Sequence, residues 1–156
     1  MSKRSAGLLA YKIVAGRILV LLVHPGGPFW RNKDRGAWTI PKGEIGDGED
    51  PLAAARREFR EETGQDVDGE VVALTPVRQA GGKIVEAWAI AADIAADAIV
   101  SNRFEMEWPP RSGRKQSFPE VDRAAWFELP EARRRINAGQ SALLEELELR
   151  LRCGRQ

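Results

Sequence analysis

The sequence GEIGDGEDPLAAARREFREETGQ occupies residues 43–65 and joins a glycine-rich acidic loop to one helical segment. Pro51 suits the first turn of a helix, where its missing N–H costs nothing, and Asp50 before it is a favourable N-cap. Gly64 is a natural stop, because glycine adopts the left-handed conformation that ends many helices. The segment therefore predicts a loop, a helix that begins at Pro51, and a second loop after Gly64.

Glu58, Glu61 and Glu62 fall on one face of this predicted helix, and two of them lie in its last turn. Like charges four residues apart and acids at a helix C-terminus are each unfavourable by a few tenths of a kcal/mol. Two interpretations are open on these residues alone. The acids form either a solvated face neutralised by the neighbouring arginines or a site for a hard divalent cation such as Mg²⁺ or Mn²⁺.

The whole stretch resembles the signature of the Nudix hydrolases, which is G, five residues, E, seven residues and R-E-U-x-E-E-x-G-U, where U is a bulky aliphatic residue. All seven fixed letters match, from Gly43 to Gly64, and Phe59 stands at the first U. Gln65 departs from the second U, and we expect Val67 to take over its packing role. The resemblance favours the cation site over the solvated acidic face.

The resemblance implies an α+β fold, namely the Nudix-type α/β/α sandwich with a mixed central β-sheet. It also implies hydrolysis of a pyrophosphate bond with Mg²⁺ or Mn²⁺ as cofactor. Glu58 and Glu62 would be metal ligands, Glu61 a further ligand with a catalytic role, and the peptide carbonyl of Lys42 or Gly43 would complete the set. Glu49 and Arg57 would pair and orient the carboxylates.

The general base is a separate question, because some family members use a glutamate of the signature and others use an acid that follows it. The candidates outside the signature are Glu105, Glu107 and Glu120. We favour Glu120, which lies between a basic insertion and a short apolar segment. A structural role for each of the three is the alternative.

Phosphate groups require positive charge and a nucleobase requires a stacking surface. The candidate cations are Lys42, Lys83 and the cluster Arg111, Arg114 and Lys115, for which a solvated loop is the alternative. Trp30, in a Gly/Pro-rich loop, is the candidate for stacking. Trp38 and Trp126 are expected in the core, and His24 at the end of a strand.

The rest of the chain predicts a single α+β domain over residues 1–156. Strands are expected at 5–14 and 17–24, joined by a tight turn, and at 37–40, 70–79, 83–91, 103–108 and 124–128. Helices are expected at 130–137 and 141–152, and a turn-rich basic insertion at 109–119.

Composition excludes several classes of protein. The 24 basic and 23 acidic residues leave a net charge of +1, which gives no global attraction to nucleic acid or membrane. The single cysteine excludes an internal disulfide, and the single histidine excludes a multi-histidine metal site. We expect a cytoplasmic protein without a membrane anchor and without a stable nucleic-acid partner. The oligomeric state does not follow from the sequence.

The substrate class is narrowed by WTIPKG at residues 38–43, which resembles the W-x-x-P-K-G of relatives that hydrolyse dinucleoside polyphosphates. The chain also resembles bacterial members described as predicted NTP pyrophosphohydrolases. The prediction is therefore a hydrolase of nucleoside or dinucleoside polyphosphates. Lys42 and the cluster Arg111, Arg114 and Lys115 carry more positive charge than a two-phosphate linkage requires, which predicts that they bind longer phosphate chains and that substrates with three or more phosphates are preferred. The alternatives are a non-hydrolytic nucleotide sensor and a hydrolase of 5′-triphosphate RNA, an oxidised dNTP or ADP-ribose.

Overall fold

The computed structural model describes residues 3–153. Its centre is a mixed β-sheet in the order β4-β6-β1-β2-β9, in which β1 runs parallel to β6 and antiparallel to β2. Strand β3 pairs with β1, and β5 pairs with β6. The strands of this sheet are β1 (Arg4–Val14), β2 (Arg17–Pro25), β3 (Lys42–Glu44), β4 (Val71–Ala73), β5 (Val77–Arg78), β6 (Ile84–Ala91) and β9 (Val121–Glu128).

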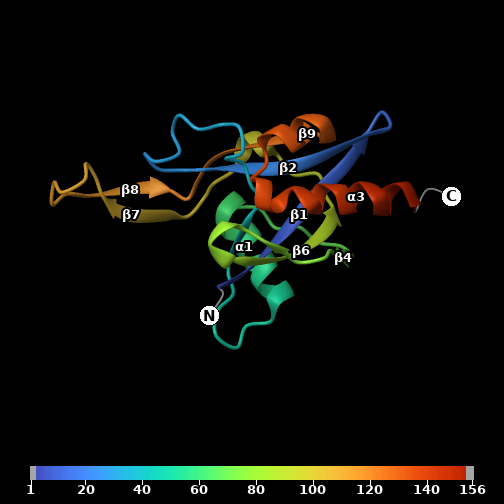
Figure 1. The fold of residues 1–156 in the computed structure, drawn as a ribbon, viewed down its shortest axis with the longest axis horizontal. Coiled ribbons are helices and arrows are strands. Elements are labelled where there is room, and N and C mark those ends of the chain that lie inside the picture. Colours follow the sequence, from blue (N-terminus) through green and yellow to red (C-terminus); the bar gives the residue numbers. More distant parts are fainter. Residues whose placement is uncertain (1–2, 154–156) are drawn as a thin grey trace.

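Helices cover both faces of the sheet. Helix α1 (Pro51–Thr63) packs on one face, and α2 (Leu129–Arg135) and α3 (Ser141–Cys153) pack on the other (Figure 1). A hydrophobic core lies on each face of the sheet, and successive residues of a strand point to opposite faces. Leu8 packs in the core beside α1, and Leu9 packs in the core beside α2 and α3. The predicted α/β/α sandwich with a mixed central sheet is confirmed.

Two short strands lie outside the sandwich. Strands β7 (Arg103–Glu107) and β8 (Lys115–Pro119) form an antiparallel hairpin that projects to the left in Figure 1, away from the central sheet. Three single turns of 3₁₀ helix connect other elements: η1 (Ala80–Gly82), η2 (Ala96–Ala98) and η3 (Ala138–Gln140). Within residues 3–153, no helix is long and apolar enough to cross a membrane.

The structure corrects the predicted strand at 37–40. Thr39 exchanges two backbone hydrogen bonds with Val23, but Trp38 donates to the Arg135 carbonyl and the Ile40 amide donates to the Gln140 side chain. These hydrogen bonds are divided among three elements, so the segment forms isolated bridges and no continuous ladder.

Two further predictions are corrected. The expected strand 70–79 is broken into β4 and β5, because the Thr75 amide donates to Glu146 and Pro76 has no N–H to donate. The expected basic insertion 109–119 is partly regular, because residues 115–119 form β8 and pair with β7. The expected strand 124–128 begins earlier, at Val121, and the helix expected over 130–137 ends at Arg135.

Candidate active site

Helix α1 begins and ends as its sequence predicts. The Asp50 side chain accepts a hydrogen bond from the Ala53 amide at 3.0 Å, and Gly64 adopts a left-handed conformation with φ of 74°. Gly64 also lets the helix end approach Val100, since a Cβ at this position would meet the Val100 carbonyl. The amide of Val100 donates to the Thr63 carbonyl and so satisfies an otherwise unpaired group of the last turn.

The departure from the signature at Gln65 has a structural explanation. The Gln65 side chain donates to the Ala95 carbonyl at 2.9 Å and accepts from the Ala95 amide at 3.2 Å, which ties the end of the signature to the loop before η2. Val67 packs beside the core under α1. The expected packing role of Val67 is therefore present, and Gln65 adds polar contacts.

Arg57 connects four acceptor groups of the signature segment. Its guanidinium holds both carboxylate oxygens of Glu49, at 2.8 and 2.9 Å, and donates to the Glu44 carbonyl at 3.1 Å. The same side chain donates to Glu58 at 2.8 Å and to Glu61 at 3.1 Å. These bonds lower the pKa of Glu49 to about 2 and raise the pKa of Arg57. The expected Glu49–Arg57 pair is present, and it orients two of the clustered carboxylates.

Gly43 and Glu58 lie in unusually close approach. A Cβ added at Gly43 would overlap the Glu58 carboxylate, so only glycine fits beside this side chain. Strand β3 thus brings the main chain of Lys42 and Gly43 against the acidic face of α1. The carbonyls that the resemblance implies as metal ligands are on this segment.

Two of the three carboxylates of this cluster are buried, whereas Glu61 is partly exposed. Glu58 is 8% exposed and Glu62 is 7% exposed. Burial raises the pKa of both groups, to about 8 for Glu62, because charge is unfavourable away from water. The Lys42 ammonium acts against this shift in Glu62, while burial and the neighbouring Lys83 lower the pKa of Lys42 itself. Lys42 therefore offsets only part of the cost of a buried negative charge on Glu62.

A chain of backbone hydrogen bonds places Glu120 beside the cluster. The Asn102 amide donates to the Glu61 carbonyl at 2.8 Å, and the Glu120 amide donates to the Asn102 carbonyl at 2.9 Å. The Gly26 amide then donates to the Glu120 carbonyl at 2.9 Å. Burial and the nearby Glu61 raise the pKa of Glu120, which suits a base that works near neutral pH.

One cavity of about 610 Å³ joins these groups. Its wall contains the carboxylates Glu58, Glu62 and Glu120, the cations Lys42 and Lys83, and the indole of Trp30. The structure thus brings most of the predicted site residues together around a space large enough for a nucleotide. The remaining lining residues are Val23, Pro25, Ala37, Thr39, Gly43, Glu44, Gln79, Val121 and Asn137.

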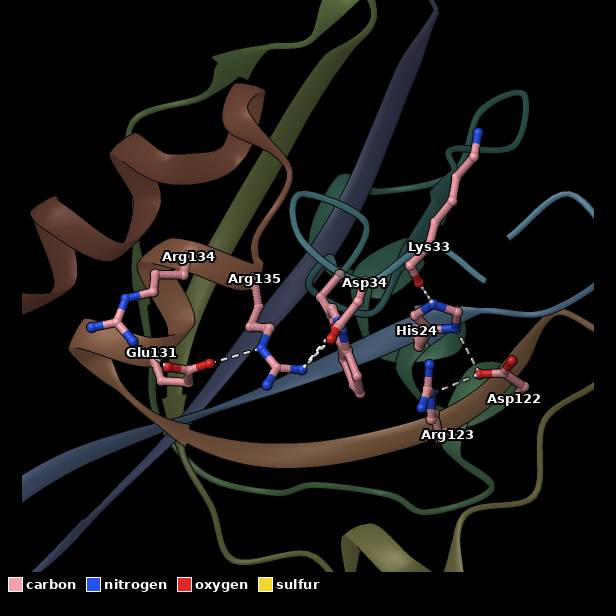
Figure 2. A network of polar contacts seen from close by, with 9 residues as sticks. His24, Lys33, Asp34, Asp122, Arg123, Glu131, Arg134 and Arg135 are labelled. Carbon is pink, nitrogen blue, oxygen red and sulfur yellow. Dashed lines mark hydrogen bonds and ion pairs between the residues drawn. The ribbon is translucent and has the colours of Figure 1, made fainter. Parts of the chain in front are cut away.

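His24 anchors the loop that carries Trp30. The ring is fully buried, and its two nitrogens face the Lys33 carbonyl at 2.6 Å and an Asp122 oxygen at 2.9 Å (Figure 2). These two contacts tie the loop at Lys33 to Asp122 on β9. Trp38 packs edge-on against His24 with ring centroids 5.2 Å apart. The predicted position of His24 at the end of a strand is confirmed, and its contacts are those of an anchor.

A second set of contacts holds the same loop. Figure 2 shows Asp34 facing the guanidinium of Arg135, and Arg135 facing Glu131 on α2. Asp34 also accepts from the Trp38 indole at 2.7 Å. Trp38 is 3% exposed, as expected for a core residue, whereas Trp126 is only partly buried and packs beside the core under α1.

The basic cluster does not reach the cavity. Arg111 and Arg114 lie at the tip of the β7–β8 hairpin, Lys115 begins β8, and all three are exposed. None of them lines the cavity that holds Lys42 and Lys83. The other candidate bases, Glu105 and Glu107, are exposed on β7 and also lie outside this cavity.

Among the polar side chains of the cavity wall that sequence reasoning missed are Gln79 and Asn137. Both are uncharged, and each stands next to a turn that the sequence shows. The turn residues predict that the chain bends there, but no pattern indicates which cavity the neighbouring amides face.

The donor set suits a hard divalent cation. Carboxylates of Glu58, Glu61 and Glu62 and main-chain carbonyls are the oxygen ligands that Mg²⁺ and Mn²⁺ take, and a cation would relieve the repulsion between buried acids. In the described part of the chain, no three His, Cys, Asp or Glu side chains are already arranged around one metal position. Arg57 holds one oxygen each of Glu58 and Glu61, which leaves the second oxygen of each carboxylate for a cation.

The NUDIX domain family matches residues 2–147. This chain belongs to the Nudix family. The predicted resemblance is therefore confirmed over nearly the whole sequence, including the part outside the signature. Membership fits the loop–helix–loop geometry around Gly43, Arg57 and Gly64.

Individual relatives agree with this membership of the Nudix family. Nudix hydrolase 25 of Arabidopsis thaliana is 56% identical over 41 residues, which are 26% of this chain and 23% of that protein. An RNA pyrophosphohydrolase of Bartonella henselae (strain Houston 1) is 38% identical over 66 residues, or 40% of this chain and 35% of that protein. The matches therefore span less than half of each relative.

A solved structure extends the likeness to the whole fold. A binary complex of a C. elegans Ap4A hydrolase superposes with a TM-score of 0.68 at 25% sequence identity. The match covers 94% of this chain and 97% of that one. The Nudix sandwich of the present structure is thus shared over its full extent.

Proposed function

We propose that this Nudix protein hydrolyses a pyrophosphate bond in a nucleoside or dinucleoside polyphosphate. One observation carries the proposal. Buried carboxylates of Glu58 and Glu62, the ammonium groups of Lys42 and Lys83, and Glu120 line the same cavity of about 610 Å³. Acids that hold a cation, cations that hold phosphates and a separate acid that accepts a proton are the parts that hydrolysis of a phosphoanhydride requires.

Each group has a role in this proposal. Glu58 and Glu62, with Glu61, would hold Mg²⁺ or Mn²⁺, and Arg57 with Glu49 would orient their carboxylates. Such a cation, when bound, neutralises phosphate charge and makes a nearby water more acidic.

The lysines and Glu120 act on the substrate and the water. Lys42 and Lys83 bind phosphate oxygens, while Glu120 accepts a proton from the water that attacks phosphorus. The bond from phosphorus to the bridging oxygen then breaks, and the leaving phosphate takes the negative charge. Trp30 offers an indole face to the base, since it is 37% exposed at the cavity.

A second substrate, 5′-triphosphate RNA, is favoured by the likeness to the RNA pyrophosphohydrolase of Bartonella henselae. The chemistry would be the same, because a triphosphate is cut at a phosphoanhydride bond in either case. The net charge of +1 gives no global attraction to RNA, so we place free nucleotides first.

The experiment is a substrate panel with Mg²⁺ or Mn²⁺ and product identification by ³¹P NMR. The panel contains nucleoside triphosphates, an oxidised dNTP, diadenosine tetraphosphate, ADP-ribose and 5′-triphosphate RNA. Cleavage of one of the polyphosphates that is lost in Glu62→Gln supports the proposal. Binding of nucleotides without cleavage of any substrate would overturn it and identify a nucleotide sensor.

A further inference from the structure

Gln79 and Lys83 lie side by side at the cavity because one tight turn joins them. The Gln79 amide donates to the Lys83 carbonyl at 2.7 Å, and the η1 turn of Ala80–Gly82 closes between them. Both side chains line the cavity that contains the carboxylates of the signature helix. Their chemistry is different, since one is a neutral amide and the other a cation.

Gln140 determines which end of the Gln79 amide is free. The backbone amide of Ile40 donates to Gln140 Oε1 at 3.0 Å, so this atom must be the oxygen. Gln140 therefore turns its NH₂ toward Gln79, whose Oε1 accepts at 3.2 Å. Gln140 is fully buried, which leaves no water to compete for these bonds. The Gln79 NH₂ is therefore the part of this side chain that remains free to donate a hydrogen bond.

The same logic applies to Asn137, before the η3 turn. The backbone amide of Gly139 donates to Asn137 Oδ1 at 2.8 Å, so the Asn137 NH₂ is the free end. Within residues 3–153, Ser5 Oγ is the one buried side-chain polar atom without a hydrogen-bond partner. Because neither amide nitrogen donates within this part of the chain, both must be accessible to solvent.

Gly139 allows the turns that carry these two amides to approach each other closely. A Cβ at Gly139 would lie 2.9 Å from the Gln79 Cα, 3.0 Å from its Cγ and 3.2 Å from Asn137 Oδ1. Real Cβ contacts are rarely this short, so the position requires glycine. The two turns therefore pack as one unit, which we call the donor wall: the NH₂ groups of Gln79 and Asn137 and the ammonium of Lys83.

We propose that the donor wall binds the oxygens of a phosphate group beyond the pair at the carboxylate cluster, and so selects substrates with three or more phosphates. This inference rests on the proposed function. An ammonium group cannot accept a hydrogen bond, and the amide oxygens are already bonded to internal donors. A phosphate is anionic and offers only acceptor oxygens, which matches the wall. A nucleobase edge usually presents donors as well as acceptors, and such donors would remain unpaired here.

Two substitutions change the wall without changing its scaffold. In Gln79→Glu, a carboxylate oxygen still accepts from Gln140, and only the free NH₂ is replaced. In Asn137→Ser, the hydroxyl can still accept from the Gly139 amide, but the NH₂ is removed, and the O–H that remains is on a shorter side chain. The donor at the position of the NH₂ is therefore lost without added charge. Gln116→Glu is the control for added charge, because it places the same carboxylate on the β7–β8 hairpin, outside the cavity, where the Gln116 NH₂ donates to the Trp108 carbonyl at 2.8 Å.

The measurement is calorimetric binding, in Mg²⁺, of a nucleoside triphosphate analogue and a diphosphate analogue whose bridging oxygens are methylene groups. These probes cannot be cleaved at those bridges, so binding is measured whether or not the protein is a hydrolase. We expect Gln79→Glu to weaken triphosphate binding about tenfold or more and Asn137→Ser about threefold to tenfold, with less than about twofold change for the diphosphate. Gln116→Glu should bind both as the wild type does.

Other outcomes would overturn the inference. Equal losses for both analogues would show that the wall does not distinguish the additional phosphate. A loss in Gln79→Glu with none in Asn137→Ser would indicate long-range repulsion in place of contact by both amides. A similar loss for a nucleoside monophosphate would indicate contact with the base or sugar.

The same proteins separate this inference from the proposed function. If the wild type prefers the triphosphate analogue as described but cleaves nothing in the substrate panel, the function fails and the donor wall stands. If it cleaves nucleotides while both variants retain the wild-type preference between the analogues, the donor wall fails and the function stands.

Discussion

The two groups of side chains at the cavity, the carboxylate cluster and the donor wall, are brought together in different ways. The carboxylate cluster comes from one continuous segment of 23 residues, in which Glu58, Glu61 and Glu62 share a helix face. The donor wall combines Gln79, Lys83 and Asn137, which become neighbours only when two separate turns pack together. Local periodicity therefore places the charged groups, whereas tertiary packing places the neutral donors.

The two regions are also stabilised differently. Ion pairs of Arg57 hold the carboxylates, and the buried charge there remains partly uncompensated. Neutral amide hydrogen bonds hold the donor wall, and they depend on the buried Gln140. We therefore expect the cluster to respond to metal and pH, and the wall to respond to the number of phosphates on the ligand.

The largest effect is expected at the cluster. Glu62→Gln removes a charged oxygen ligand at constant size, so kcat should fall about a thousandfold or more. Glu58→Gln should behave similarly. Steady-state kinetics with the best substrate of the panel test this, and circular dichroism checks that the fold is retained. Activity near that of the wild type in either variant would remove that residue from the metal-binding set.

Arg57→Lys should have a smaller effect and lower kcat/KM about tenfold to a hundredfold. A lysine keeps the charge but cannot hold both oxygens of Glu49 while also reaching Glu58 and Glu61. Arg60→Lys is the matched control, since Arg60 lies on the same helix and pairs with the exposed Asp66, at 3.9 Å, away from the carboxylate cluster. Equal kinetics for Arg57→Lys and the control would contradict an orienting role for the guanidinium.

A smaller effect is expected on the stability of the fold, and its size should depend on pH. The folded protein raises the pKa of Glu62 to about 8, whereas an unfolded chain has a value near 4.3. Between these values the folded state binds the extra proton, so the wild type loses stability as pH rises through this window. Glu62→Gln cannot ionise and avoids this loss.

The difference in Tm between Glu62→Gln and the wild type should therefore be small near pH 4.5 and reach a few degrees near pH 8, in a chelator. Added Mg²⁺ should remove the advantage of the variant, because a cation compensates the charge of the wild type. Thermal melts at both pH values test this. The same difference in Tm at both values would show that Glu62 does not ionise in this range.

Much of the fold and the cluster follows from the sequence. Asp50, Pro51 and Gly64 fix where α1 begins and ends, because caps act on their own neighbours in the chain. The apolar runs on either side of Ala15 and Gly16 likewise predict the β1–β2 hairpin. These signals are local, so no knowledge of the packed structure is required to interpret them.

The features that the sequence did not predict depend on hydrogen-bond partners that are distant in sequence. Gln79 and Gln140 are 61 residues apart, and the free end of the Gln79 amide depends on a bond that Gln140 makes to Ile40. The segment 37–40 failed as a predicted strand for the same reason, since its hydrogen bonds go to three different elements. Tertiary contacts determine these hydrogen bonds, and such contacts leave no periodic pattern in the sequence.

The smallest effect is expected from the basic residues of the hairpin. The sequence suggested that Arg111, Arg114 and Lys115 bind the longer phosphate chains, but the structure places them on a projecting hairpin outside the cavity. Exposed charges separated from a ligand by more than about 10 Å are largely screened at moderate salt. Replacing Arg114 and Lys115 together by Ala should therefore change KM by less than about twofold, for tri- and diphosphate substrates alike.

This prediction separates the donor wall from the hairpin as the origin of any preference for long phosphate chains. Steady-state kinetics of the double variant should be compared at about 20 mM and 150 mM salt, since long-range attraction by exposed charges would appear only at low salt. A rise in KM for triphosphates alone, at both salt concentrations, would mean that the hairpin closes over the cavity and contacts the substrate. The preference would then belong to the hairpin, and Gln79→Glu should leave it unchanged.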